Sequence, residues 1–209
     1  MYTPPAFKEE TLSVLHATIE AASLSTFVTA TADGLLATPL PLLLDRDEGP
    51  YGTLYGHLAR ANPQGTTAPI GAAMATFMGP DAYVTPSWYA SKREHGKVVP
   101  TWNYVAAHVT GAVEAFNDAA ALRRQIGLLT DIMEKSAAVP WAVSDAPDDY
   151  IAKMINGITG LRLAIESIEG VRKLSQNRAE PDRLGVLNGF THSPDHAARE
   201  LAAEMQKKA

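Results

Sequence analysis

The sequence contains no cysteine. That absence excludes disulfide bonds, thiolate zinc sites, iron–sulfur clusters and cysteine nucleophiles. The sequence also lacks the run of about 20 apolar residues that a membrane-spanning helix needs, since its longest run, Leu40–Leu44, is short and contains Pro41. No basic segment followed by an apolar stretch opens the chain, so no secretory signal is visible and we expect a cytoplasmic protein.

Positive charge is also scarce. The chain has 18 Lys and Arg residues against 23 Asp and Glu residues, a net charge of −5, and such a surface repels nucleic acid on average. Residues 170–209 carry a small positive excess, but they contain no run of Lys or Arg. The sequence shows no helix-turn-helix or zinc-finger pattern. DNA therefore stays open as a partner, but composition does not support it.

What the chain does contain is enough apolar material for a core, with 46% hydrophobic and 20% charged residues among 209. Its first half alternates short segments rich in β-branched residues with Gly and Pro turn signals, and Asp33-Gly34 is the strongest hairpin signal among them. Short strands at this density favour a barrel. The expected elements are a helix over 7–22 and strands over 25–31, 35–44, 51–58, 71–78, 81–85 and 104–116.

Residues after 116 are expected to add helices and one more strand. Apolar residues at helical spacing follow Asn117, which we expect to cap that helix. The alternating pattern over 161–166 predicts a strand that closes the barrel. Two further helices are expected, over 148–156 and after Ser193-Pro194. The sequence thus predicts a mainly β (α+β) fold with peripheral helices, as one domain over residues 1–190 and a C-terminal helix over 191–209.

The segment Gly56–Gln64 follows a predicted strand and lacks a strong helical pattern. It brings His57, Arg60 and Asn62 close together in sequence. An arginine can grip a phosphate through two N–H groups, and the backbone N–H groups of a turn can add more. The alternative is a polar surface loop that ends at Pro63, because the segment matches neither a P-loop nor a dinucleotide-binding fingerprint.

Two neighbouring segments, Pro86–Tyr89 and Val99–Tyr104, gather two of the three tryptophans and two of the seven tyrosines. Aromatic faces with polar tips suit a flat heteroaromatic ligand. The same residue types also suit a core or a dimer interface, and the sequence alone does not separate these interpretations.

The segment Lys173–Arg178 follows the predicted closing strand and is rich in hydrogen-bond donors. It is interpreted either as a second anion-contacting segment or as a capped turn before Pro181. His192 and His196 have a metal-binding spacing, but Ser193-Pro194 separates them and no matching carboxylate is present, so we expect no metal site.

Taken together, these segments resemble the PaiB-like family of FMN-binding split-barrel proteins. The resemblance rests on several motifs that occur in the family's order and extends from residue 1 to about 190. The motifs read MYTPPAF (Met1–Phe7), GHLARANPQ (Gly56–Gln64), GPDAYVTPSWY (Gly79–Tyr89), VPTWNY (Val99–Tyr104), a strand with His108 and Gly111, and KLSQN (Lys173–Asn177).

The resemblance implies a six-stranded antiparallel Greek-key split barrel, flavin-reductase-like, that forms a homodimer and binds FMN at the interface. The expected dimer contact is Trp102–Val113. The implied phosphate-binding loop contains His57, Arg60, Ala61 and Asn62. The flavin ring would lie along Thr38, Leu40 and Tyr55. The neighbouring subunit would supply Trp102, Tyr104, Lys173, Ser175 and Gln176.

The chain departs from the family pattern at three places. Pro39 stands where the family has His before Leu-Pro, and Asp81 stands where it has His after Gly-Pro. Gly170-Val171-Arg172 stands where it usually has Gly-Lys. Pro39 removes a backbone donor close to the expected ring position.

Three functions fit the resemblance. The family is usually described as negative transcriptional regulators, which makes a flavin-dependent regulator or sensor the first expectation. A flavin oxidoreductase is the second, because related split barrels reduce flavins or oxidise vitamin B6 phosphates. A haem-binding protein is the third, because some split barrels bind haem at the same interface.

Overall fold

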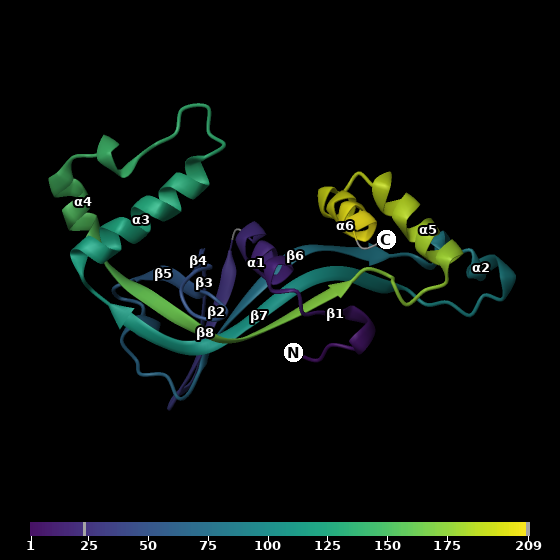
Figure 1. Ribbon diagram of the computed structural model, residues 1–209, viewed down its shortest axis with the longest axis horizontal. Coiled ribbons are helices and arrows are strands. Elements are labelled where there is room, and N and C mark those ends of the chain that lie inside the picture. The colour runs from purple at the N-terminus through teal and green to yellow at the C-terminus, as the bar shows by residue number, and fades with distance from the viewer. Residues whose placement is uncertain (23, 208–209) are drawn as a thin grey trace. The chain divides into compact units, whose positions relative to one another are not determined.

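The structure is a computed structural model that describes residues 1–22 and 24–207 (Figure 1). Strands provide the framework. They are β1 (Lys8–Glu9), β2 (Ser25–Thr31), β3 (Gly34–Leu40), β4 (Leu43–Asp45), β5 (Thr53–Ala59), β6 (Ala73–Val84), β7 (Thr101–Phe116) and β8 (Ile158–Lys173). The helices are α1 (Leu12–Ala21), α2 (Ser91–Glu94), α3 (Ala119–Glu134), α4 (Asp148–Ile155), α5 (Glu180–Thr191) and α6 (His196–Lys207), with short 3-10 turns η1 (Pro5–Phe7), η2 (Pro63–Gly65), η3 (Pro86–Trp88) and η4 (Val143–Asp145).

The strands of the described residues form one eight-stranded sheet in the order β3-β2-β6-β7-β8-β5-β4, with β1 paired to β8. The pairs β2–β3, β4–β5, β5–β8 and β1–β8 are antiparallel. This confirms the expected class, mainly β with peripheral helices. The sheet has more strands than the six expected, because the short β1 and β4 also join it. No helix within residues 1–22 and 24–207 is long and apolar enough to cross a membrane.

The described chain divides into two compact units. The first unit contains Met1–Ala22, Phe77–His108 and Glu169–Ala209, of which residues 208 and 209 are outside the description. The second unit contains residues 24–76 and Val109–Ile168. The long strands β6, β7 and β8 contribute residues to both units.

The first unit is stabilised by an apolar cluster under its two C-terminal helices. Phe190 of α5 and Leu201 and Met205 of α6 are almost fully buried there with Tyr89. Full burial of such a side chain contributes roughly 1.5–3 kcal/mol. Close packing of α5 depends on Gly185, because a Cβ at that position would lie 1.9 Å from the carbonyl oxygen of Trp88. Any larger residue at 185 would push α5 away from η3.

The second unit has its own cluster beneath α3 and α4. Leu122 of α3 packs with Ile151 and Ile155 of α4, and the ring of Phe116 packs against them. Asp118 caps α3, since its side chain accepts a hydrogen bond from the backbone N–H of Ala121. The expectation that Asn117 is the cap was therefore wrong by one residue.

The predicted helix over 7–22 begins only at Leu12. Residues 8–9 instead pair as β1 with Val171 and Gly170 of β8. The side chain of Glu9 accepts hydrogen bonds from the backbone N–H groups of Glu10 and Thr11. These contacts satisfy backbone donors outside a helix, so the chain stays extended until residue 11.

Three further differences concern strand and helix lengths. The predicted strands 71–78 and 81–85 form the single strand β6, which continues through Gly79-Pro80. The predicted strand 35–44 is divided into β3 and β4 around Pro41. Strand β8 extends beyond 161–166 at both ends, mainly at its C-terminal end. Helix α5 was not predicted, and its low amphipathicity explains why periodicity did not reveal it. The helix at 148–156 and the strand at 25–31 were predicted correctly.

Candidate functional site

The residues predicted to bind the flavin divide between the two units. The second unit contains Thr38, Leu40, Tyr55, His57, Arg60, Ala61 and Asn62, and the first unit contains Trp102, Tyr104, Lys173, Ser175 and Gln176. Each group has its own network of contacts.

The loop after β5 is held against β3 by Asn62. The Nδ2 of Asn62 donates to Thr38 Oγ1 at 3.0 Å, and Thr38 Oγ1 in turn donates to Gln64 Oε1 at 2.7 Å. The Oδ1 of Asn62 accepts from the backbone N–H of Gln64 at 2.9 Å and caps η2. The structure therefore brings the predicted residues Thr38 and Asn62 into direct contact.

Gln64 is a residue of this site that sequence reasoning missed. Its side chain is buried, and Nε2 lies within hydrogen-bonding distance of the Phe27 carbonyl oxygen, Thr29 Oγ1 and the Leu36 carbonyl oxygen. It thereby fixes the loop to the hairpin β2–β3. Its place at the end of the motif Gly56–Gln64 was the only sequence signal for this role.

Arg60 is exposed at the start of the same loop, next to the exposed Ala61. Its Nη2 donates to the Ile158 carbonyl oxygen at 2.9 Å, and its backbone N–H donates to the Gly157 carbonyl oxygen at 2.8 Å. Arginine has five N–H donors, and the other N–H groups of this guanidinium have no hydrogen-bond partner among the described residues. The side chain is thus anchored at one nitrogen and free to bind an anion with the rest.

Tyr55 and Leu40 are less available than expected. The Tyr55 hydroxyl donates to Glu48 Oε2 at 2.5 Å, and Glu48 Oε1 accepts from Arg162 Nε at 2.9 Å. Burial and the hydrogen bond to Glu48 raise the pKa of Tyr55, so the phenol stays protonated. The Leu40 side chain is buried, and its carbonyl oxygen accepts from the Ser25 hydroxyl at 2.8 Å. Any contact between Leu40 and a ligand on the surface must therefore use the remaining backbone atoms.

His57 lies opposite Gly160 in the β5–β8 ladder. The absence of a side chain at 160 makes room for the ring of Phe116, whose nearest atom would lie 2.3 Å from a Cβ there. His57 is half-buried, and its Nδ1 is buried without a hydrogen-bond partner among the described residues. Burial lowers the pKa of His57 below its usual value, so the imidazole is neutral at neutral pH.

The first unit presents an aromatic surface beside a cation. Trp102 is 52% exposed and packs edge-to-face on Tyr83, with 6.0 Å between ring centres. Lys173 Nζ lies 5.9 Å from the centre of the Tyr104 ring and donates to Thr101 Oγ1 at 2.7 Å. Burial and the nearby charge of Arg178 lower the pKa of Lys173. Such a surface can accept a flat aromatic molecule that carries negative charge.

Ser175 and Gln176 shape the loop after β8. Ser175 has a φ of 61°, a left-handed conformation that non-glycine residues rarely adopt. Its hydroxyl is held by the amide of Asn103, whose Nδ2 donates to Ser175 Oγ at 3.0 Å. Gln176 Oε1 accepts from the backbone N–H of Leu174 at 2.7 Å. Both side chains therefore bind within the protein, and Asn103, which was not predicted, is the buried residue that anchors the loop.

The two histidines with metal-binding spacing do not face each other across a helix turn. His192 directly follows α5 as its C-cap, with its Nδ1 2.9 Å from the Asn188 carbonyl oxygen. His196 begins α6 with its Nδ1 3.6 Å from Glu200 Oε2. The residues that the structure describes contain no group of three His, Asp or Glu side chains able to hold a metal ion.

Comparison with known proteins identifies the family. A family model described as "Putative FMN-binding domain" matches residues 1–167. The chain belongs to this family of FMN-binding domains. A Bacillus subtilis member, named protease synthase and sporulation protein PAI 2, is 30% identical over 209 residues, which is 100% of this chain and 98% of that protein. The PaiB-like resemblance of the motifs is therefore confirmed.

Solved structures of more distant proteins show the same fold. The flavocytochrome Anf3 from Azotobacter vinelandii has a TM-score of 0.58 at 14% identity, over 79% of this chain and 69% of that chain. A protein from Mycobacterium smegmatis described as binding FAD and haem has a TM-score of 0.57 at 16% identity, over 79% of this chain and 73% of that one. At such identities these similarities establish the fold alone.

Proposed function

We propose that the protein binds FMN, with the loop after β5 holding the phosphate. The observation that carries the proposal is Arg60, an exposed guanidinium anchored by the Ile158 carbonyl oxygen that keeps further N–H groups for an anion. Charge-assisted hydrogen bonds of this kind are about twice as strong as neutral ones. Asn62 holds the same loop against β3 through its hydrogen bond to Thr38. The family match over residues 1–167 supports the same ligand.

The isoalloxazine ring requires a flat surface and a donor or cation near its pyrimidine end. Trp102, Tyr104 and Lys173 offer these features in the first unit. The proposed site therefore combines the β5 loop of one subunit with this aromatic surface of a second subunit in a homodimer. When bound, FMN supplies redox chemistry and visible absorption; the residues of this chain bind it and orient its ring.

The visible spectrum of the purified protein, recorded before and after FMN is added and free flavin is removed, tests the proposal. Retained flavin absorption at a stoichiometry near one per chain supports it. A protein that retains no flavin at micromolar FMN refutes it. Riboflavin, which lacks the phosphate, is the matched control ligand and should be retained much more weakly.

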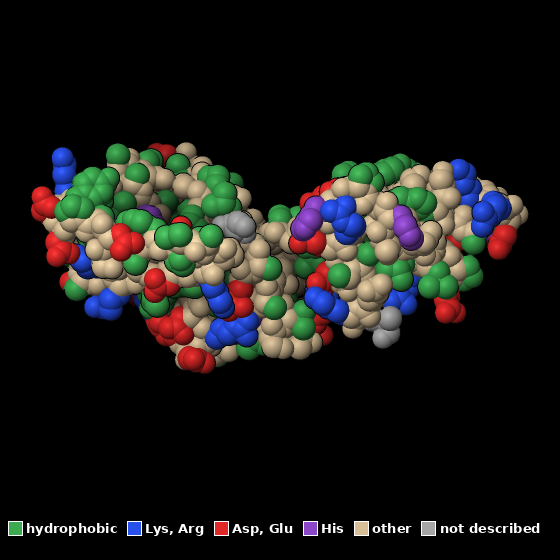
Figure 2. Space-filling view, turned by 90° about the horizontal axis from the view of Figure 1, so that it is seen from above, with side chains coloured by type: hydrophobic (Ala, Val, Ile, Leu, Met, Phe, Trp, Pro, Cys, Tyr) green, Lys and Arg blue, Asp and Glu red, His purple; other side chains and the backbone are tan. Residues whose placement is uncertain are grey.

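We propose that flavin binding serves a sensing or regulatory role. The PAI 2 relative is named for protease synthesis and sporulation, which is compatible with such a role. Direct, tight DNA binding has less support, because the net charge is −5 and Lys and Arg side chains are interspersed with Asp and Glu on the face shown in Figure 2. A salt-dependent mobility shift of DNA at physiological salt would reverse this preference.

Haem binding is a second candidate function. It is favoured by His57, a half-buried imidazole that burial keeps neutral, because neutral imidazole is a common metal ligand. Two proteins of the same fold are described as a flavocytochrome and as binding haem. A Soret band on addition of haemin that is lost in His57→Ala, and kept in His192→Ala, would support haem binding over FMN.

A further inference from the structure

The first unit contains a cavity of about 530 Å³ beside α1 that involves none of the candidate flavin residues. This volume is within the usual range of small-molecule sites, about 300–1,000 Å³. Apolar side chains form its walls, with Val14 and Ala17 on α1 and Pro80 and Val105 on strands β6 and β7. Its charged lining consists of Glu9, Arg172, Glu204 and Lys207.

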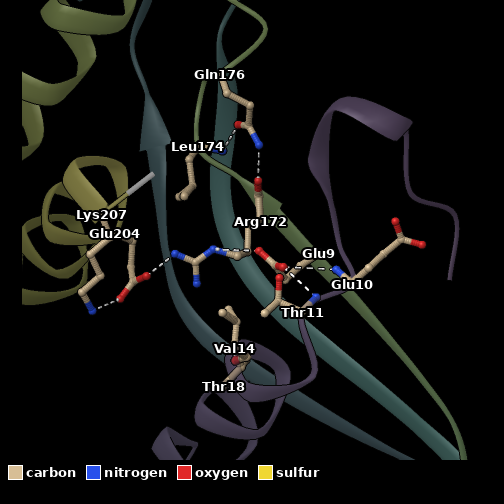
Figure 3. A network of polar contacts seen from close by, with 10 residues as sticks. All are labelled: Glu9, Glu10, Thr11, Val14, Thr18, Arg172, Leu174, Gln176, Glu204 and Lys207. Carbon is tan, nitrogen blue, oxygen red and sulfur yellow. Dashed lines mark hydrogen bonds and ion pairs between the residues drawn. The ribbon is translucent and has the colours of Figure 1, made fainter. Parts of the chain in front are cut away.

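Arg172 is the central residue of this lining and is only 7% exposed (Figure 3). Its Nη2 donates to Glu204 Oε2, and its Nε lies 3.8 Å from Glu9 Oε2. Its Nη1 has no hydrogen-bond or ion-pair partner among the described residues. Figure 3 shows this third nitrogen pointing toward Val14 of α1, which is a wall of the cavity. A buried guanidinium thus offers unused N–H donors to the cavity.

Charge balance limits what the cavity can accept. Two cations, Arg172 and Lys207, face two carboxylates, Glu9 and Glu204. Lys207 Nζ lies 2.9 Å from Glu204 Oε1, and Glu9 Oε1 is already an acceptor for two backbone N–H groups. An ionic ligand would add one uncompensated charge to this partly buried cavity, and the desolvation of that charge would disfavour binding. An uncharged acceptor oxygen would instead satisfy the Arg172 donors without disturbing the balance.

We propose that this cavity binds an uncharged amphipathic small molecule, whose carbonyl or amide oxygen accepts from Arg172 Nη1. The apolar part of the ligand lies along Val14 and Ala17 on one side and Pro80 and Val105 on the other. The proposal is independent of flavin binding, because its residues and those of the candidate flavin site do not overlap.

Three probes of equal chain length separate the ligand classes: octanamide, octanoate and octylammonium. We expect saturable binding of octanamide to the protein of residues 1–209 in ligand-observed NMR titrations. Octanoate and octylammonium should bind at least ten-fold more weakly, since each adds an unpaired charge. Failure of octanamide to bind, or equal or tighter binding of either charged probe, overturns the proposal.

A pair of variants on α1 places the probe in the cavity. Ala17 is exposed to the cavity and can be enlarged without disturbing the core, so Ala17→Phe should fill the space and weaken octanamide binding at least ten-fold. Glu20→Phe adds the same side chain to the same helix at an exposed position outside the cavity lining, and should leave binding unchanged. Unfolding curves confirm that both variants fold. If Ala17→Phe binds octanamide as the wild type does, the cavity is not the site.

Discussion

Asn103 and Ser175 are 72 residues apart in sequence, yet the amide of the first holds the hydroxyl of the second in the buried interior of the first unit, with 3.0 Å between Nδ2 and Oγ. This contact joins the VPTWNY and KLSQN motifs. It also fixes the loop in which Ser175 has a left-handed φ of 61°. Two segments that looked like separate binding motifs in the sequence are therefore parts of one structural unit.

Substitutions at this contact should affect stability through two separable causes. Ser175→Ala keeps the strained φ and removes the hydroxyl that pairs with both Nδ2 and Oδ1 of the buried Asn103 amide, which should cost about 1–3 kcal/mol of unfolding free energy. Ser175→Gly loses the same hydroxyl but relieves roughly 1–2 kcal/mol of left-handed strain at φ 61°. That relief exceeds the roughly 0.4–1 kcal/mol that glycine costs through the entropy of the unfolded chain, so Ser175→Gly should be the more stable of the two variants. Urea unfolding followed by tryptophan fluorescence measures both. A Ser175→Gly variant that is less stable than Ser175→Ala would show that φ at 175 carries no strain.

Arg60→Ala should weaken FMN binding by on the order of 1.5–3 kcal/mol, because it removes a charge-assisted contact to the phosphate. Riboflavin binding should hardly change. Arg123→Ala is a matched control, since Arg123 is also an exposed arginine of the second unit and pairs with Asp148 at 2.7 Å. Equal weakening of FMN and riboflavin by Arg60→Ala would mean that Arg60 acts on the loop structure and not on the phosphate.

The protein should be a homodimer in solution, because the proposed site needs residues from two subunits. Light scattering at micromolar concentration should give about twice the chain mass of 22.4 kDa. Trp102→Glu, which places a charge on the exposed aromatic surface, should shift the mass toward the monomer and weaken FMN binding at the same time. A wild-type monomer that nevertheless binds FMN would rule out the shared site.

The FMN-loaded protein should react slowly or not at all with NADH and NADPH. The sequence has no nicotinamide-binding fingerprint, and Pro39 removes one backbone N–H close to the expected ring position. Stopped-flow absorption measures reduction of the bound flavin directly. Reduction at several per second or faster, which is typical of enzymes, would make the oxidoreductase interpretation the better one.

His57 should make the protein sensitive to acid. Burial lowers the pKa of His57 in the folded state below its ordinary value of 6.5, so the unfolded chain binds the proton more readily. Folding stability therefore falls as pH decreases below about 6.5. His57→Gln removes this contribution, and its melting temperature should drop less than that of the wild type between pH 7.5 and pH 5.5. A larger drop in the variant would contradict the neutral, buried imidazole.

The sequence predicted the parts of the fold that depend on local patterns. The strand at 25–31 and the helix at 148–156 have clear periodicity, and both were found. The contacts that organise the candidate site could not be read from spacing, because Asn103, Gln64 and Ser175 act on partners distant in sequence. The length of β8 escaped prediction for the same reason, since its second half pairs with β1 at Lys8 and Glu9.

The alternation of side chains along β8 has a consequence for reading sequence variation in this family. Arg172 lines the cavity beside α1, whereas the next residue, Lys173, contacts Thr101 and Tyr104 of the candidate flavin surface. Successive residues of a strand point to opposite faces, so these two neighbours lie in different surroundings. A single insertion or deletion upstream in β8 would exchange the environments of these two positions. In a sequence alignment, a gap misplaced by one position would therefore attribute changes in the cavity lining to the candidate flavin surface, or the reverse.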